Sequence, residues 1–127
     1  MVKDKPTILI VDDDPFILDM YVLKFQEKGF AIAIAKNGKD ALKKMKETSP
    51  RVMLLDIVLP AMDGFEVLRT LKEDPALRDV KVILLTNLGQ KEDVDRGMKL
   101  GADDYIIKAH FTPNEVVEKV KRVLGIS

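Results

Sequence analysis

The sequence predicts a doubly wound α/β fold, in which helices cover both faces of a five-stranded parallel sheet. Five short aliphatic runs recur along the 127 residues, and the segments between them have apolar residues at helical spacing. The runs lack polar alternation, which is typical of strands that are buried on both faces. Strands that alternate with helices pair in parallel through right-handed crossovers, so these observations together favour one doubly wound domain.

The predicted strands are the five aliphatic runs, at residues 8–11, 31–35, 52–55, 82–85 and 105–107. Two helices between or after them have long apolar stripes, formed by Ile17, Leu18, Tyr21, Val22 and Phe25 and by Val116, Val117, Val120, Val123 and Leu124. Three further helices have shorter stripes, formed by Ala41, Leu42 and Met45, by Phe65, Leu68 and Leu71, and by Val94 and Met98. We expect these stripes, and the methionines Met45, Met53, Met62 and Met98, to fill the core.

Residues that cap helices support these boundaries. Asp14 followed by Pro15 predicts an N-cap and a first helical position where the missing N–H of proline costs nothing. Thr112 with Glu115 three residues later predicts a capping box for the last helix. Glycines stand where helices would need a left-handed end, at Gly29, Gly101 and Gly125.

The composition limits the function classes. Lysine plus arginine and aspartate plus glutamate each total 21, so the formal net charge is +0 and no global field favours nucleic acid or anionic lipid. The absence of cysteine excludes disulfides and thiolate metal sites, and it suits a reducing compartment such as the cytoplasm. No apolar run is long enough for a signal peptide or a membrane span, and no linker divides residues 1–127. We expect a single cytoplasmic domain without nucleic-acid or membrane partners.

Polar residues stand directly behind four of the predicted strands. Asp12 and Asp13 follow the first strand, Asp56 the third, Thr86 the fourth and Lys108 the fifth. The carboxyl ends of parallel strands share one edge of the sheet, where ligands of such folds bind, so these residues should converge. The sequence predicts a cluster of three carboxylates, one hydroxyl and one ammonium group.

This set of groups suits phosphoryl transfer to an aspartate. Carboxylates at this density favour a hard divalent cation, and Mg²⁺ prefers one or two carboxylates together with water and phosphate oxygens. A lysine such as Lys108 can neutralise phosphoryl oxygens, and a hydroxyl such as Thr86 can donate to them. Glycine-rich phosphate loops are absent, and a single histidine gives little material for a histidine-based site.

Each residue also has a simpler interpretation when it is taken alone. Asp14 is expected to act only as a helix cap, and Asp12 or Asp13 alone could be a solvated loop residue. Asp56 could begin a turn, Thr86 could be a strand-end hydroxyl and Lys108 could be a solvated charge. The coincidence of these residues behind different buried strands favours a common site.

The segments "ILIVDDDPF", "VMLLDIVLPAMDGFEVL", "VILLT" and "GADDYIIK" resemble, in this order and spacing, the receiver domain of bacterial two-component response regulators, the CheY-like family. The resemblance covers the whole chain. It implies a flavodoxin-like sheet in the order 2-1-3-4-5 with five flanking helices. It also implies that Asp56 is the phosphoacceptor, fed by a phosphohistidine on a sensor histidine kinase or a histidine phosphotransfer protein.

The same resemblance assigns roles to the other site residues. Asp12 and Asp13 would hold Mg²⁺, Asp13 directly and Asp12 through water, and the backbone carbonyl of Val58 would be a further ligand. Thr86 and Lys108 would grip the phosphoryl group.

A signalling role is implied for Tyr105, whose rotamer would follow the inward movement of the Thr86 hydroxyl. The affected surface would be the fourth helix, fifth strand and fifth helix, which a downstream target or effector domain would contact. The alternative is that Tyr105 is a half-buried strand aromatic without a switching role. The sequence leaves open whether phosphorylation drives homodimerisation through this surface.

Some positions depart from the family pattern. Ala109 stands where the family has a proline after a cis bond, so we expect a trans bond and a reshaped, longer loop after Lys108. Asn87 replaces a small residue after Thr86 and would crowd the pocket or add a donor. Val58 and Leu88 are apolar at positions that influence hydrolytic water in the family, which predicts a long-lived phosphoaspartate.

Two other functions compete with the phosphorylated switch. A receiver-like interaction module that is not phosphorylated is kept open by the altered stretch after Lys108. The spacing of Asp12 and Asp14 suggests a phosphatase of the haloacid dehalogenase type, but Phe16 stands where that family has threonine or valine. No effector domain is expected in this chain, and no enzymatic activity beyond assistance to its own phosphoryl transfer and slow dephosphorylation.

Overall fold

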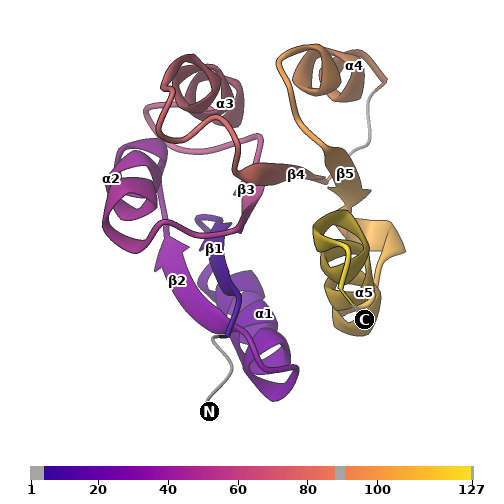
Figure 1. Cartoon of the computed structure of the whole chain (residues 1–127). Coiled ribbons are helices and arrows are strands. Elements are labelled where there is room, and N and C mark those ends of the chain that lie inside the picture. Colours follow the sequence, from indigo (N-terminus) through magenta and orange to yellow (C-terminus); the bar gives the residue numbers. More distant parts are fainter. Residues whose placement is uncertain (1–4, 88–90, 127) are drawn as a thin grey trace.

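The computed structural model describes residues 5–87 and 91–126, which form a five-stranded parallel sheet between two layers of helices (Figure 1). The strand order is β2-β1-β3-β4-β5, so the predicted order 2-1-3-4-5 is confirmed. The strands are β1 (Thr7–Val11), β2 (Ala31–Ala35), β3 (Val52–Asp56), β4 (Lys81–Thr86) and β5 (Asp104–Ile107).

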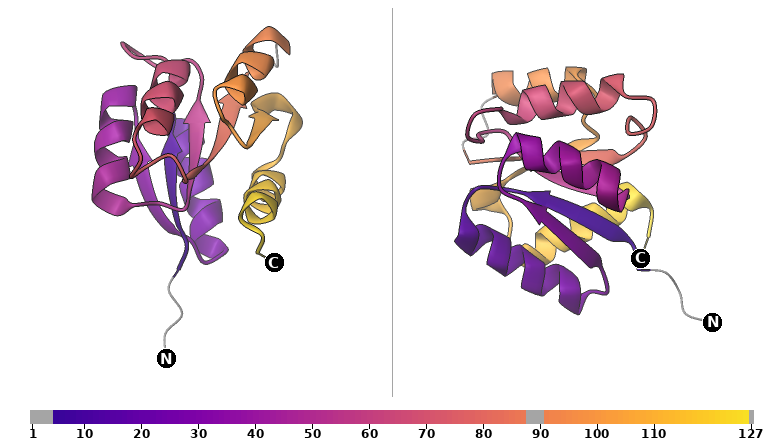
Figure 2. Two further views of the ribbon diagram at one scale, coloured as in Figure 1. Left: turned by 45° about the horizontal axis from the view of Figure 1, so that its top comes forward. Right: turned by 90° about the vertical axis from the view of Figure 1, so that its left-hand side faces the viewer.

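The helices divide between the two faces of the sheet. They are α1 (Pro15–Glu27), α2 (Gly38–Thr48), α3 (Gly64–Glu73), α4 (Lys91–Lys99) and α5 (Pro113–Leu124), with a short 3₁₀ helix, η1 (Lys108–His110), before α5. Helices α2, α3 and α4 cover one face, and α1 and α5 cover the other (Figure 2). Within the described ranges, none of the helices combines the length and the apolar character needed to span a bilayer.

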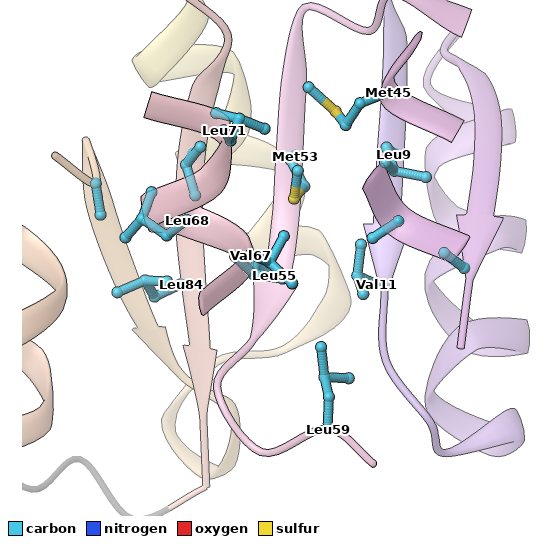
Figure 3. Packing of buried hydrophobic residues seen from close by; sticks show 14 of the residues in the cluster. Leu9, Val11, Met45, Met53, Leu55, Leu59, Val67, Leu68, Leu71 and Leu84 are labelled. Carbon is cyan, nitrogen blue, oxygen red and sulfur yellow. The ribbon is translucent and has the colours of Figure 1, made fainter. Parts of the chain in front are cut away.

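Alternate residues of the strands supply two separate apolar layers. In β1, Leu9 and Val11 join the layer under α2 and α3, whereas Ile8 and Ile10 join the layer under α1 and α5. Figure 3 shows the first layer, where Met53 and Leu55 of β3 lie among side chains from the neighbouring elements. Both faces of the sheet are covered, which agrees with the continuous apolar runs in the middle of the strands.

The predicted helix ends are confirmed. The Asp14 carboxylate accepts a hydrogen bond from the Phe16 N–H at 2.9 Å, which caps α1. Thr112 and Glu115 form both hydrogen bonds of a capping box at the start of α5. The three glycines expected at left-handed positions have positive φ angles, at Gly29, Gly101 and Gly125.

Helix α4 packs differently from the expectation. Met98 is 40% exposed, so its prediction as a core residue is wrong, and the buried residue of the helix is Gly97. A Cβ atom on Gly97 would overlap the Leu84 side chain, so the helix backbone itself lies against the sheet. The Arg96 guanidinium adds a second attachment, 4.3 Å from the ring centre of Phe65. The predictions for Met45 and Met53 as buried core residues are confirmed.

Candidate functional site

The carboxyl edge of the sheet brings the predicted polar residues together. Asp12 and Asp13 follow β1, Asp56 ends β3, Thr86 ends β4, and Lys108 follows β5 as the first residue of η1. Asp12 is fully buried, and Asp56 and Thr86 are 5% and 8% exposed. Burial of two carboxylates is costly unless other groups compensate for the lost water, so their partners define the site.

Lys108 is the partner of both buried carboxylates. Its Nζ atom lies 2.6 Å from Oδ2 of Asp12 and 3.0 Å from Oδ2 of Asp56, and its side chain is 8% exposed. One buried ammonium group therefore joins the ends of β1 and β3 to the segment after β5. The replacement of proline by Ala109 does not move the lysine out of the site.

Backbone donors fix the other oxygen of each carboxylate. The Val58 N–H donates to Oδ1 of Asp56 at 3.1 Å, and the Asp14 N–H donates to Oδ1 of Asp12 at 3.0 Å. The chain after Asp56 folds back so that Gly64 lies against the Asp56 backbone. A Cβ on Gly64 would overlap the Asp56 carbonyl oxygen. Both carboxylates are therefore oriented before any ligand binds.

The charged groups shift one another's proton affinities. Burial raises the pKa of Asp56, and the nearby Lys108 charge opposes this rise only in part. Burial lowers the pKa of Lys108, but its hydrogen bond to Asp12 and the charges of Asp56 and Asp12 outweigh that effect and raise the pKa overall. The lysine is therefore held as a cation, and the buried Asp56 carboxylate is stabilised less well than it would be in water.

Three carboxylates are arranged as a divalent cation would require. One oxygen from each of Asp12, Asp13 and Asp56 lies within 4.8 Å of the others, and Asp13 is exposed while the other two are buried. Oxygen ligands of this kind fit Mg²⁺, with the exposed side open to water. The N–H of Val58 contacts Asp56. The predicted role of its carbonyl as a metal ligand is not tested by this contact.

The two residues predicted to act as the switch differ in burial. Thr86 is 8% exposed at the edge of the pocket, whereas Tyr105 on the neighbouring strand β5 is 37% exposed. The β4–β5 register pairs Thr86 with Ile107 and Leu84 with Tyr105. Tyr105 is therefore on the outside in this structure, and both interpretations of its role remain predictions.

The segment after Lys108 is a short helical turn, and its predicted difference in shape from the family's loop stays a prediction. Residues 108–110 form η1, and Ala109 and His110 are exposed. No cis peptide bond occurs in the described residues, so the predicted trans bond before Ala109 is confirmed. Asn87 is exposed after Thr86, and Leu88 lies outside the described residues.

Tyr21 is a neighbour of the site that sequence reasoning missed. It is 3% exposed in the apolar layer under α1, as its stripe predicted. Burial raises the pKa of its phenol, the Lys108 charge opposes this rise, and the Asp12 and Asp56 charges add to it. Its hydroxyl is therefore within electrostatic reach of the pocket, and a tyrosine in an apolar stripe gives no sequence signal of that position.

Comparisons with known protein families and sequences find similar proteins over most of the chain. The family described as response regulator receiver domain matches residues 8–121. The DNA-binding response regulator MtrA of Mycolicibacterium smegmatis is 39% identical over 114 residues, which are 90% of this chain and 48% of that protein. The phosphate regulon transcriptional regulatory protein PhoB of Escherichia coli is 37% identical over 92% of this chain and 51% of its own. The chain spans about half the length of these curated relatives.

Solved structures show the same fold over nearly the whole chain. A CheY-like response regulator receiver domain protein from Methanospirillum hungatei has a TM-score of 0.88 at 33% identity, covering 96% of this chain and 95% of its own. The chemotaxis response regulator CheY4 of Vibrio cholerae has a TM-score of 0.88 at 26% identity, with 94% and 99% covered. The BeF3-activated DrrB receiver domain has a TM-score of 0.84 at 36% identity, with 96% and 99% covered.

Proposed function

The chain belongs to the response regulator receiver domain family, and from this membership we propose that Asp56 is the residue that accepts the phosphoryl group. Domains of this family are phosphoacceptor switches of two-component signalling rather than metabolic enzymes. The observation that carries the proposal is the Lys108 ammonium group, which lies 3.0 Å from Asp56 beside two further carboxylates.

In the proposed reaction, a carboxylate oxygen of Asp56 attacks the phosphorus of a phosphohistidine. The new O–P bond makes an acyl phosphate, the P–N bond breaks, and the histidine nitrogen leaves with the electron pair and takes up a proton. The Val58 N–H keeps the Asp56 carboxylate oriented, because it already donates to Oδ1. Lys108 neutralises charge on the transferred oxygens, and the Thr86 hydroxyl donates to one of them.

Asp12, Asp13 and Asp56 would hold a magnesium ion, with the Val58 carbonyl as a further ligand, because the three carboxylate oxygens lie within 4.8 Å of one another. When bound, this ion supplies positive charge to the phosphoryl oxygens. Receiver domains generally bind Mg²⁺ at such an acidic cluster. Asp12 would remain oriented by the Asp14 N–H and would also keep the Lys108 ammonium group in the pocket.

The outer face of α1 supports a docking surface for the phosphodonor, either a sensor histidine kinase or a phosphotransfer protein. Phe16, Met20 and Leu23 are 83%, 44% and 63% exposed and follow helical spacing on one side of α1. Exposed large apolar side chains at this spacing are typical of a surface that packs against a partner helix. The helix begins next to the acidic residues, so a partner on this face would approach Asp56.

Signal output is proposed through α4, β5 and α5, to a downstream target or an effector domain, with Thr86 and Tyr105 as the switch. The names of the relatives MtrA and RpaA describe them as DNA-binding. We expect any DNA binding that involves this chain to be carried out by such an effector domain. The proposed site of action is the cytoplasm. A chain without cysteine forms no disulfide and so does not depend on an oxidising compartment.

The competing functions have less support. The module that is not phosphorylated depends on the altered stretch after Lys108, yet the lysine reaches Asp56. The phosphatase would need a second catalytic aspartate at Asp14, whose carboxylate instead accepts the Phe16 N–H as a helix cap.

Acetyl phosphate with Mg²⁺, followed by intact-mass and peptide mass spectrometry, tests the proposal. The expected result is one phosphoryl group on Asp56 and none on an Asp56→Asn variant. Release of phosphate that continues in the Asp56→Asn variant would instead indicate the phosphatase, and an unmodified wild-type protein would indicate the inactive module.

A further inference from the structure

Lys119 of α5 contacts three residues of the segment that carries Lys108. Its Nζ atom lies 3.3 Å from Oδ2 of Asp104, and its side chain is 20% exposed. The same atom lies 6.0 Å from the ring centre of Tyr105 and 5.4 Å from that of Phe111. Figure 1 shows β5 next to α5, the two elements that this cation joins.

These contacts lie on both sides of Lys108 in the chain. Asp104 and Tyr105 begin β5, which leads into Lys108, and Phe111 directly follows η1. Phe111 also packs against the apolar layer under α1 and α5. Lys119 of α5 therefore contacts the chain both before and after Lys108.

The attraction between Lys119 and Tyr105 depends on where the ring lies. A cation near an aromatic face gains free energy from the ring's electron density, and this gain is larger where water is partly excluded. Tyr105 is 37% exposed and lies outward, with its ring centre 6.0 Å from the Lys119 Nζ atom. Movement of the ring toward Thr86 would take it away from the cation, while Asp104 and Phe111 would keep the cation in place.

We propose that Lys119 is a positioning residue that holds Tyr105 in its outward position and so opposes the phosphorylated conformation. The inference rests on the proposed function, in which Tyr105 follows Thr86 inward. It goes further by assigning the stabilisation of the resting state to a single cation on α5. Loss of this cation should favour the activated state even before any phosphoryl group is present.

The test uses two substitutions of Lys119 and a matched control. Lys119→Met removes the charge and keeps an unbranched apolar stem, whereas Lys119→Arg retains a cation for both Asp104 and the rings. Lys121→Met removes the same charge from the same helix, at a residue without an ion pair or ring contact in the described part of the chain. Thermal unfolding checks that each variant folds.

The first measurement is the NMR spectrum of ring-labelled tyrosine without phosphodonor. The chain has two tyrosines, and buried Tyr21 serves as an internal reference for Tyr105. Lys119→Met is expected to shift the Tyr105 resonance toward its position in the beryllofluoride-bound wild type. Lys119→Arg and Lys121→Met should leave it near the resting position.

The second measurement is a beryllofluoride titration with Mg²⁺. Lys119→Met should bind the analogue about threefold more tightly than the wild type, which is the size expected for one lost cation–π contact. Equal affinity, weaker affinity, or the same gain in Lys121→Met would overturn the role of Lys119. Failure of the wild type to bind would instead overturn the proposed function, so the two failures are distinguishable.

Discussion

The ammonium nitrogen of Lys108 lies 2.6 Å from the carboxylate of Asp12, a residue 96 positions earlier in the chain. This contact is shorter than the 3.0 Å contact between Lys108 and Asp56. Asp12 can therefore keep the lysine in the pocket while Asp56 changes its charge and size on phosphorylation.

Lys108→Met is expected to destabilise the metal-free protein by about 3 kcal/mol, because it leaves two buried carboxylates without their cation. Mg²⁺ should then raise the unfolding midpoint of the variant more than that of the wild type, since the ion compensates the same charges. Chemical denaturation in EDTA and in Mg²⁺ measures both effects. The matched control is Lys46→Met, at an exposed lysine of α2, and an equal loss there would contradict a special role for Lys108.

Asp56→Asn should stabilise the metal-free protein at neutral pH. Burial raises the pKa of Asp56, so this carboxyl favours folding when it is protonated, and that contribution is lost as pH rises through the raised pKa. Asparagine does not ionise, so the variant does not lose this contribution. The difference in free energy of unfolding between variant and wild type should be largest at neutral pH and should vanish below the ordinary carboxyl pKa. Urea unfolding of both proteins in EDTA across this pH range is the measurement. An advantage that grows in acid would contradict the direction of the shift.

Phosphorylated Asp56 should be long-lived, because Val58 is apolar and 76% exposed beside it and cannot orient a hydrolytic water. A variant with Val58→Asn and Leu88→Glu supplies polar groups at these positions and should lose its phosphoryl group faster. The decay is followed after acetyl phosphate is removed by rapid desalting. Equal decay rates would refute the explanation.

Ala61→Gly should stabilise the protein by about 1 kcal/mol. Ala61 has a φ of 67°, a left-handed conformation that is costly for a residue with a Cβ and free for glycine. Thermal or urea unfolding measures the gain. Gly29→Ala is the reciprocal control, because Gly29 has a φ of 88° and open space around it, so only backbone strain is added. The interpretation fails if both substitutions change stability in the same direction.

Leu23→Ser should slow phosphorylation by a histidine kinase severalfold and leave phosphorylation by acetyl phosphate unchanged. Leu23 is 63% exposed on the proposed docking face of α1, so it would contribute to protein binding and not to chemistry. Initial rates with both donors separate these steps. Met98→Ser, at a 40% exposed residue of α4, is the control, and an equal effect there would remove the case for α1.

Much of the fold could be predicted because its signals are local. The aliphatic runs mark the strands to within one residue at every end, and caps such as Asp14 and Thr112 mark where helices begin. The site followed from topology, since parallel strands bring their carboxyl ends to one edge. Residues from distant segments could thus be assigned to one cluster before any coordinates.

The parts that the sequence missed depend on packing at close range. The burial of Gly97 in place of Met98 could not be predicted, because a glycine gives no apolar signal. Gly97 lacks a side chain and so allows the backbone of α4 to lie close to Leu84. The position of the Lys108 ammonium group could not be predicted from the sequence, because Ala109 stands where the family pattern has a proline. Burial of Asp12 and the ion pair decide the lysine's position, and neither is visible in local sequence.

At the ends of β1 and β3, a residue of the apolar core is followed directly by a residue of the charged pocket. Val11 and Leu55 are fully buried core residues, and the next residues, Asp12 and Asp56, are the charged groups of the pocket. Mutation can therefore alter the reactive rim while the scaffold beneath it persists. Such an architecture gives natural selection freedom to retune signal lifetime or partner choice without having to invent a new way of folding.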